Sequence, residues 1–180
     1  MKIFIRGLIA FSIALAIYTA APYLAQEKVE LASVRTVPQR ATVLGYDRTS
    51  QFGSWRGGVR EEVVNNTGEI DLYSGHQLDR SDAEVDHIFP LSAAWDLGAH
   101  SWPATQRFKF ANDPINLVLV SRAENQEKSD QLPSEWLPSD RSAQCWYVER
   151  LFHVALAYDL PLPEEDVKVS QNQCGFAKPW

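Results

Sequence analysis

Glu84-Val85-Asp86-His87-Ile88-Phe89-Pro90 opens the part of the chain around which the rest is organised. That part continues through Ile115-Asn116-Leu117-Val118-Leu119-Val120 and closes with Ala123-Glu124-Asn125-Gln126-Glu127-Lys128-Ser129-Asp130. The first segment alternates like a short strand that a proline ends. The second segment is apolar and rich in β-branched residues, which favours a buried strand. The third segment is polar and predicts a short helix.

Five polar side chains in these segments are candidates to meet at one site: Asp86, His87, Asn116, Asn125 and Lys128. A carboxylate and an amide oxygen can hold a hard divalent cation, and an imidazole can take a proton from water near neutral pH. This combination suits metal-assisted hydrolysis of a phosphodiester. Asp86 and His87 fall on opposite faces of an ideal strand, so we expect the strand end at Pro90 to bring both to the site.

The order and spacing of the three segments resemble the HNH, or ββα-metal, endonuclease superfamily. The resemblance is to the branch that contains the C-terminal nuclease domain of GmrSD-type restriction enzymes and small exported bacterial HNH proteins, and the HNH domain of RNA-guided CRISPR nucleases is similar. His87 and Asn116 are 29 positions apart, and Asn116 and Asn125 are 9 apart. The resemblance covers residues 84–138 well and 46–150 loosely. It implies an α+β fold with a ββα-metal core, helices inserted between the two motif strands, and a C-terminal helix.

The resemblance also implies a role for each candidate residue. His87 is expected to be the general base, and Asn116 to hold its ring. Asp86 and Asn125 are expected to bind one divalent metal ion. Mg²⁺ fits these oxygen ligands best, Mn²⁺ can replace it, and Zn²⁺ is less suited. Lys128 is expected to contact a phosphate of the substrate.

Two arginines are further candidates for contacts to nucleic acid. Arg60 precedes Glu61-Glu62-Val63-Val64, and in the similar exported HNH proteins an arginine precedes a short apolar strand, so we expect a short strand here. Relatives carry an acidic residue before the arginine, where this chain has Gly58 and Val59, so a salt bridge is the alternative role for Arg60. Arg122 lies three residues before Asn125 on the expected helix and therefore shares its face.

The function expected from these residues is metal-dependent cleavage of nucleic acid, with DNA favoured over RNA. One alternative is a non-catalytic ββα domain that binds nucleic acid or a partner at the cell envelope. Another is an exported hydrolase that acts on a different phosphodiester. The polar residues can also be ordinary capping and buried groups of an α+β domain.

Hydrophobic periodicity predicts the remaining elements. We expect helices at 93–97 and 101–111 between the motif strands, the second capped by Ser101. Residues 142–158 have a helical apolar stripe, and 164–168 read as a short helical turn. A turn is expected at 65–68 between two strands.

Residues 1–25 differ in character from the rest. Two basic residues precede an apolar run, which is typical of an export signal, and the cleavage site after that run is poor. We therefore expect a signal peptide or an N-terminal membrane anchor at 1–25, and a nuclease-like domain at 26–180. A buried core helix is the alternative for the first segment.

The chain has two cysteines, Cys145 and Cys174. In an oxidising compartment they are expected to pair, which stabilises the fold by about 3–4 kcal/mol in the chain-entropy model. The sequence has no Cys-x-x-Cys, so no structural zinc is expected.

The charge of the chain is unusual for a protein that binds nucleic acid. The formal net charge is −6, and without the two basic residues of 1–25 it is −8. Contacts to phosphates normally supply most of the affinity for nucleic acid. The negative net charge argues against tight non-specific binding to nucleic acid. It is compatible with a local basic patch, or with a metal ion that bridges the protein and a phosphate.

Overall fold

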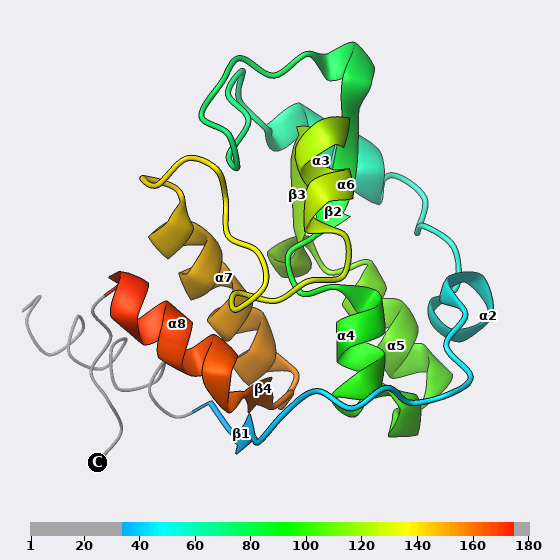
Figure 1. Cartoon of the computed structure of the whole chain (residues 1–180). Helices are drawn as coiled ribbons and strands as arrows, with labels where there is room; N and C mark the ends of the chain where they lie inside the picture. Colours follow the sequence, from blue (N-terminus) through cyan, green and yellow to red (C-terminus); the bar gives the residue numbers. More distant parts are fainter. Residues whose placement is uncertain (1–33, 175–180) are drawn as a thin grey trace, which may run out of the picture.

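The computed structural model of the chain describes residues 34–174, and these residues form a mixed α+β arrangement (Figure 1). Small sheets are surrounded by helices, as the α+β prediction requires. In chain order the elements are β1 Thr36–Val37, α2 Arg48–Phe52, α3 Val59–Asn66, η1 Arg80–Asp82, β2 Ala83–His87, α4 Leu91–Asp96, η2 Ala99–Ser101, α5 Ala104–Ala111, η3 Pro114–Asn116, β3 Leu117–Ser121, α6 Arg122–Lys128, α7 Gln144–Ala157, β4 Leu162–Pro163 and α8 Glu164–Cys174.

The antiparallel pair β2–β3 lies near the centre of the molecule, with α6 alongside both strands (Figure 1). In its register Asp86 is opposite Val118, and His87 is opposite Leu117. α6 follows β3 directly, because the Ser121 hydroxyl accepts a hydrogen bond from the Glu124 amide and caps the helix. The predicted order of strand, strand and helix is therefore confirmed.

Helices fill the connection between β2 and β3, as predicted, but their boundaries differ. α4 begins at Leu91, immediately after Pro90, and α5 begins only at Ala104. The predicted cap at Ser101 is wrong, since Ser101 ends η2 and its hydroxyl donates to the Gly98 carbonyl. The extended backbone of Pro103 separates η2 from α5.

The strand expected after Arg60 is a helix, α3. Gly58 supplies a left-handed residue (φ 84°) at its N-cap, and Glu61 and Glu62 lie in the first turn, where the helix dipole favours negative charge. Val59 and Val63 are four apart and share one helix face, which is buried. The motif 65–68 ends this helix rather than joining two strands.

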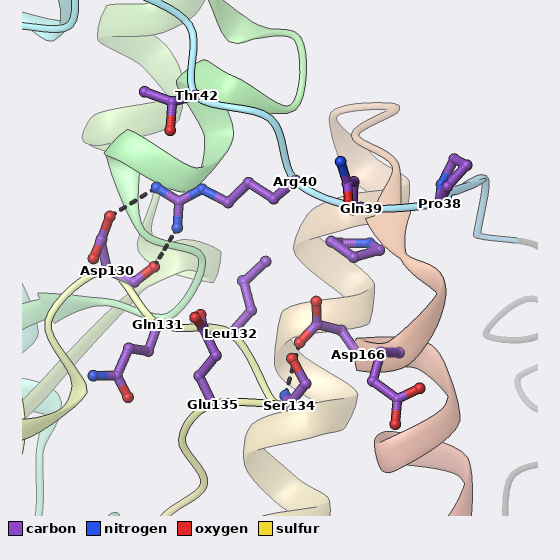
Figure 2. Close-up of a pocket in the computed structure, with 12 residues that line it drawn as sticks. Pro38, Gln39, Arg40, Thr42, Asp130, Gln131, Leu132, Ser134, Glu135 and Asp166 are labelled. Atoms are coloured by element: carbon purple, nitrogen blue, oxygen red, sulfur yellow. Dashed lines mark hydrogen bonds and ion pairs between the residues drawn. The ribbon is translucent and has the colours of Figure 1, made fainter.

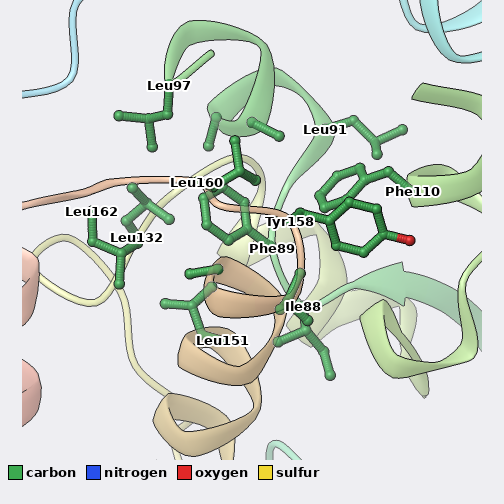
Figure 3. Close-up of a cluster of buried hydrophobic side chains, with 14 of the residues drawn as sticks. Ile88, Phe89, Leu91, Leu97, Phe110, Leu132, Leu151, Tyr158, Leu160 and Leu162 are labelled. Carbon is green, nitrogen blue, oxygen red and sulfur yellow. The ribbon is translucent and has the colours of Figure 1, made fainter. Parts of the chain in front are cut away.

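The main hydrophobic core fixes the end of β2. Ile88 and Phe89, which follow His87 directly, are fully buried in a cluster with α4, α5 and α7 (Figure 3). A smaller core joins Val59 and Val63 of α3 to the other face of β3. The chain that leaves His87 is thus anchored on one side, while α3 covers the opposite face of the strand pair.

The C-terminal part is close to its prediction. α7 spans Gln144–Ala157, against the predicted 142–158, and α8 continues to Cys174, well beyond the short turn expected. The predicted disulfide between Cys145 and Cys174 is confirmed, with Cα atoms 5.3 Å apart. β1 and β4 form a short parallel pair beside α8.

The segment 1–25, expected to be a signal or an anchor, lies outside the described residues. Within 34–174 no helix has the length and apolar character needed to cross a membrane.

Candidate active site

Asp86 and His87 are the last two residues of β2, and both line one pocket of about 140 Å³. At the strand end both residues therefore reach one pocket, although their side chains contact different neighbours. The full lining is Tyr46, Arg48, Asp86, His87, Pro90, Leu91, Ser92, Ser129 and Asp130.

The imidazole of His87 has one nitrogen in use and one free. Nε2 lies 2.9 Å from the carbonyl oxygen of Ala111. A carbonyl only accepts hydrogen bonds, so Nε2 carries the proton and Nδ1 carries the lone pair. Nδ1 has no hydrogen-bond partner among the described residues. This nitrogen is not completely buried, so it keeps some contact with solvent. This is the tautomer that a general base at Nδ1 requires.

The surroundings of His87 keep the ring neutral. Burial lowers the pKa of His87 to about 3, and the positive charges of Arg48 and Lys128 act in the same direction. The hydrogen bond to Ala111 opposes these effects only in part. The lone pair on Nδ1 is therefore present throughout the neutral range.

Two arginines gather beside His87 on a single indole. The ring of Trp55 stacks on His87, with centroids 5.2 Å apart and planes 10° from parallel. The guanidinium carbons of Arg48 and Arg60 lie 5.3 and 5.7 Å from the centroid of the same indole. Arg60 thus lies near the site, as predicted, while Arg48 and Trp55 were missed by the sequence analysis. Nothing in the sequence of the segment before the motif shows that it folds back on His87.

The carboxylate of Asp86 is buried with its own counter-charge. Lys128 Nζ lies 2.9 Å from Oδ2 and 3.2 Å from Oδ1 of Asp86, and the Tyr73 hydroxyl donates to Oδ2 at 2.8 Å. Burial raises the pKa of Asp86, while Lys128 and Tyr73 favour the ionised form and offset part of that rise. The site therefore contains an anchored carboxylate beside the neutral imidazole.

The position of Lys128 differs from the prediction that it contacts a phosphate. Its side chain is 0% exposed, and Nζ also donates to the His87 carbonyl at 2.8 Å. In this arrangement Lys128 holds the end of β2 and cannot reach a ligand outside the protein.

Asn116 also lies elsewhere than expected. Its Oδ1 accepts from the Phe89 amide at 2.7 Å, and its Nδ2 donates to the Phe89 carbonyl at 3.2 Å. In place of the expected contact with the His87 ring, Asn116 fixes the backbone two residues beyond it. The buried Asn116 amide thus fixes the backbone of Phe89, just after β2 ends.

Asn125 does not line the pocket, but it lies along the same face of β2 as Asp86. Its Nδ2 donates to Glu84 Oε2 at 2.7 Å. Because a carboxylate only accepts, the amide nitrogen faces Glu84, and Oδ1 is left without a partner among the described residues. Glu84 and Asp86 are two apart in the strand, so their side chains point to one face, roughly 7 Å from each other along it.

Arg122 is engaged in ion pairs at the surface. Its guanidinium lies 2.8 Å from Asp82 Oδ1 and 3.0 Å from Glu84 Oε1. The predicted shared face with Asn125 is present, since both residues contact Glu84. Arg122 is not among the residues that line the pocket.

A second pocket of about 480 Å³ adjoins the first through Asp130 (Figure 2). Arg40 in this pocket is 2.7 Å from Asp130, and it lies equally close to Asp96. Its charge is therefore already neutralised. Glu135, Glu165 and Asp166 also line this pocket, so it has no character of an anion-binding site.

The ligand set available for a metal ion is small and rich in oxygen. Residues 34–174 contain no group of three or more His, Cys, Asp or Glu side chains placed to hold a metal. Of the two predicted ligands, the Asp86 carboxylate lines the pocket, whereas the Asn125 amide contacts Glu84 and does not line it. A hard ion that keeps part of its hydration shell fits such ligands.

Comparison with known proteins gives one family and one relative. The family model for the C-terminal domain of GmrSD restriction endonucleases matches residues 47–162. A protein of Arthroderma benhamiae, described as an uncharacterized secreted protein, is 45% identical over 82 residues, which cover 44% of this chain and 40% of that protein. The match therefore spans less than half of the relative's length. No solved structure matches the chain.

Proposed function

Because the chain belongs to the family of GmrSD restriction endonuclease C-terminal domains, we propose that it is a metal-dependent endonuclease that hydrolyses phosphodiester bonds of nucleic acid, DNA in preference to RNA. In this proposal β2, β3 and α6 are the ββα-metal unit of an HNH-type nuclease. The observation that carries the proposal is the arrangement of His87: Nε2–H is held by the Ala111 carbonyl, the lone pair of Nδ1 is free, and His87 lines the same pocket as Asp86.

His87 is the general base of the proposed reaction. Nδ1 takes a proton from the water that attacks phosphorus, and the hydrogen bond to Ala111 keeps the opposite nitrogen protonated. A neutral ring with a pKa of about 3 is a weak base. A phosphate bound in the pocket brings negative charge next to the imidazole, and this charge raises its proton affinity.

The positive charges that receive the phosphate are those of Arg48 and Arg60. Arg48 lines the pocket, and neither guanidinium has an ion-pair partner among the described residues. Such free guanidinium groups suit bidentate hydrogen bonding to phosphate oxygens. Lys128 and Arg122, which are paired with carboxylates, act instead on the shape of the site.

Asp86 and Asn125 are the proposed protein ligands of one divalent ion, Mg²⁺, with Mn²⁺ as a substitute and Zn²⁺ less suited. When bound, such an ion stabilises negative charge on the phosphate and on the leaving oxygen. Glu84 orients the Asn125 amide for this role, because it accepts from Nδ2 and leaves Oδ1 free. Lys128 favours the ionised form of Asp86 and holds the carboxylate in place.

Export from the cell is part of the proposal. The basic and apolar layout of 1–25 predicts a signal peptide or an anchor, and the Arthroderma benhamiae relative is described as secreted. The disulfide is in keeping with an oxidising compartment.

The test is a cleavage assay with plasmid DNA, RNA and a small chromogenic phosphodiester, each with Mg²⁺, Mn²⁺ or EDTA. We expect nicked DNA only with metal ion, and a loss of 10²–10⁴-fold in the rate for His87→Ala. His153→Ala, which replaces an exposed histidine of α7, is the matched control and keeps full activity. Circular dichroism and thermal unfolding show whether each variant is folded.

Three other results lead to different conclusions. Equal rates for wild type and folded His87→Ala remove the mechanism. Cleavage of the chromogenic compound alone indicates a hydrolase for another phosphodiester. Binding of nucleic acid or metal without any product indicates a non-catalytic binding domain.

A further inference from the structure

The indole of Trp55 is the point where the candidate base and the free arginines meet. Trp55 lies in the connection between α2 and α3, outside the three motif segments. It is partly buried, and one part of it packs against the small core of α3 and β3. Its ring also stacks on His87 and lies under the guanidinium groups of Arg48 and Arg60, contacts that core packing alone does not require.

The His87 ring needs two constraints to present Nδ1 in one direction. The hydrogen bond from Nε2 to Ala111 sets the direction of one ring atom. It leaves the ring able to tilt about the line of that bond. A flat indole 10° from parallel removes this freedom, and it also closes one ring face to water.

The same indole orders the arginines without neutralising them. A cation over an aromatic face is attracted by the ring quadrupole and keeps its hydrogen-bond donors free. Arg40 and Arg122, by contrast, are held by carboxylates, which compete with a phosphate for the same donors. Arg48 and Arg60 therefore combine a defined position with free donors.

We propose that Trp55 is a positioning residue of the nuclease site, which holds the plane of the His87 imidazole and the guanidinium groups of Arg48 and Arg60 toward the substrate phosphate. This proposal rests on the proposed function. Trp55 takes no part in the bond changes of the proposed reaction and acts through the His87 ring and the two arginines.

The first test compares Trp55→Leu with Trp55→Phe in cleavage of DNA with Mg²⁺. We expect Trp55→Leu to lower kcat by about 100-fold, since a small misplacement of a catalytic group has an effect of this size. Trp55→Phe keeps a flat ring and should stay within about 5-fold of wild type, an expectation based on the same dependence on geometry. Trp102→Leu is the matched control, because Trp102 is a partly buried tryptophan with aromatic neighbours that does not line the pocket.

The second test asks whether Trp55 acts through His87. In the His87→Ala background the base is missing, so adding Trp55→Leu should lower the residual rate far less than it does in wild type. A purely structural role predicts the same factor in both backgrounds. Arg48→Gln should instead raise KM with a smaller change in kcat. If Trp55→Leu does not fold, Trp55→Met keeps apolar volume without a flat ring and replaces it.

The outcomes separate the two proposals. If the wild type cleaves DNA and folded Trp55→Leu has the same kcat, the proposed role of Trp55 is overturned and the proposed nuclease function stands. The same conclusion follows if Trp55→Phe is as slow as Trp55→Leu, or if the loss is unchanged without His87. No metal-dependent cleavage by wild type overturns the proposed function and this proposal with it.

Discussion

Lys128 is a fully buried ammonium group next to the candidate catalytic residues. It bonds the Asp86 carboxylate and the His87 carbonyl, so one side chain of α6 binds both residues at the end of β2. Removing one partner of a buried ion pair leaves the other charge without compensation, which is far more harmful than losing a surface pair. The stability of the site and its electrostatics therefore depend on the same residue.

Lys128→Met is expected to lower the free energy of unfolding by about 3–5 kcal/mol. The methionine fills the space, but Asp86 loses its counter-charge and keeps only neutral partners such as the Tyr73 hydroxyl. The measurement is urea unfolding at pH 7. Lys168→Met, which removes an exposed pair with Glu165, is the control and should change stability by less than about 1 kcal/mol. A similar small change for Lys128→Met would contradict the buried pair.

The sequence was sufficient to predict the local motif but not the contacts made across the fold. Asp86 and His87 are adjacent, so their common place at the strand end follows from Pro90 alone. Arg48 and Trp55 reach His87 only through the packing of α2 and α3, which no spacing in the sequence reveals. Lys128 lies on a polar helix, where a solvated side chain is the ordinary expectation, and its burial depends on Asp86 opposite.

At the scale of elements, the end of β2 is shaped by its neighbours. The Asn116 amide bonds both the amide and the carbonyl of Phe89, and Asp71 bonds the amides of Tyr73 and Ser121. The Asn116 amide thus holds the backbone just beyond the end of β2, and Asp71 holds the end of β3, which pairs with the start of β2. The positions of Asp86 and His87 are therefore held by side-chain bonds to the backbone as well as by the sheet.

Asn116→Leu is expected to lower the free energy of unfolding by about 2–4 kcal/mol, because two buried backbone groups of Phe89 lose their partners. Asn125→Leu, on a partly exposed face of α6, should change stability by less than about 1 kcal/mol and still abolish metal-dependent cleavage. Denaturant unfolding and the plasmid assay distinguish the two. If both substitutions lowered the free energy of unfolding equally, Asn125 would also have a structural role in stabilising the fold.

The Asp71 carboxylate makes stability depend on pH. Burial alone would raise its pKa, but the amides of Tyr73 and Ser121 outweigh burial, and the pKa of Asp71 is lowered from 3.8. Because the pKa of Asp71 is lower in the folded state than in the unfolded state, the ionised carboxylate stabilises the fold fully above about pH 4. This stabilisation disappears as the pH falls through the pKa that Asp71 has in the folded state.

Asp71→Asn should therefore be less stable than wild type by about 1–3 kcal/mol at pH 7, and the difference should shrink below pH 4. Urea unfolding at pH 7, 5 and 3 measures it. A difference that stays constant across this range would show that Asp71 is not ionised in the folded chain.

The helices show which patterns are sufficient for prediction. α7 has a long stripe of period 3.6, and its predicted ends are within two residues of those observed. α3 has only Val59 and Val63 on its buried face, and β-branched residues in such a short segment suggest a strand equally well. This segment forms a helix rather than a strand because Gly58 can adopt the N-cap conformation, and because β3 presents an apolar surface on which Val59 and Val63 pack.

At the scale of the molecule, the disulfide is the main covalent constraint on the described part of the chain. It joins the first turn of α7 to the end of α8, away from the pocket. α8 has a largely polar sequence and few buried residues, so it gains little from burial by itself. The bridge is therefore expected to act mainly on stability.

Replacing both cysteines by serine should lower the free energy of unfolding by about 3–4 kcal/mol, since the bridge closes a loop of 29 residues. The rate of DNA cleavage at 25 °C should stay unchanged. Thermal unfolding of the wild type with and without reductant gives the same comparison without mutation. A large loss of activity in a folded variant would mean that α8 also shapes the pocket.

The salt link between Asp86 and Lys128 has a consequence for how the chain matures. Since the carboxylate already has a positive partner from within the polypeptide, the nascent protein does not have to capture an ion in order to finish folding. Chelators should stop turnover and leave the fold unharmed, and adding Mg²⁺ back should restore the rate within mixing time, with no refolding step. In the proposed mechanism, assembly and activation are thus separate events, and the second can wait until the protein reaches an environment that supplies the ion.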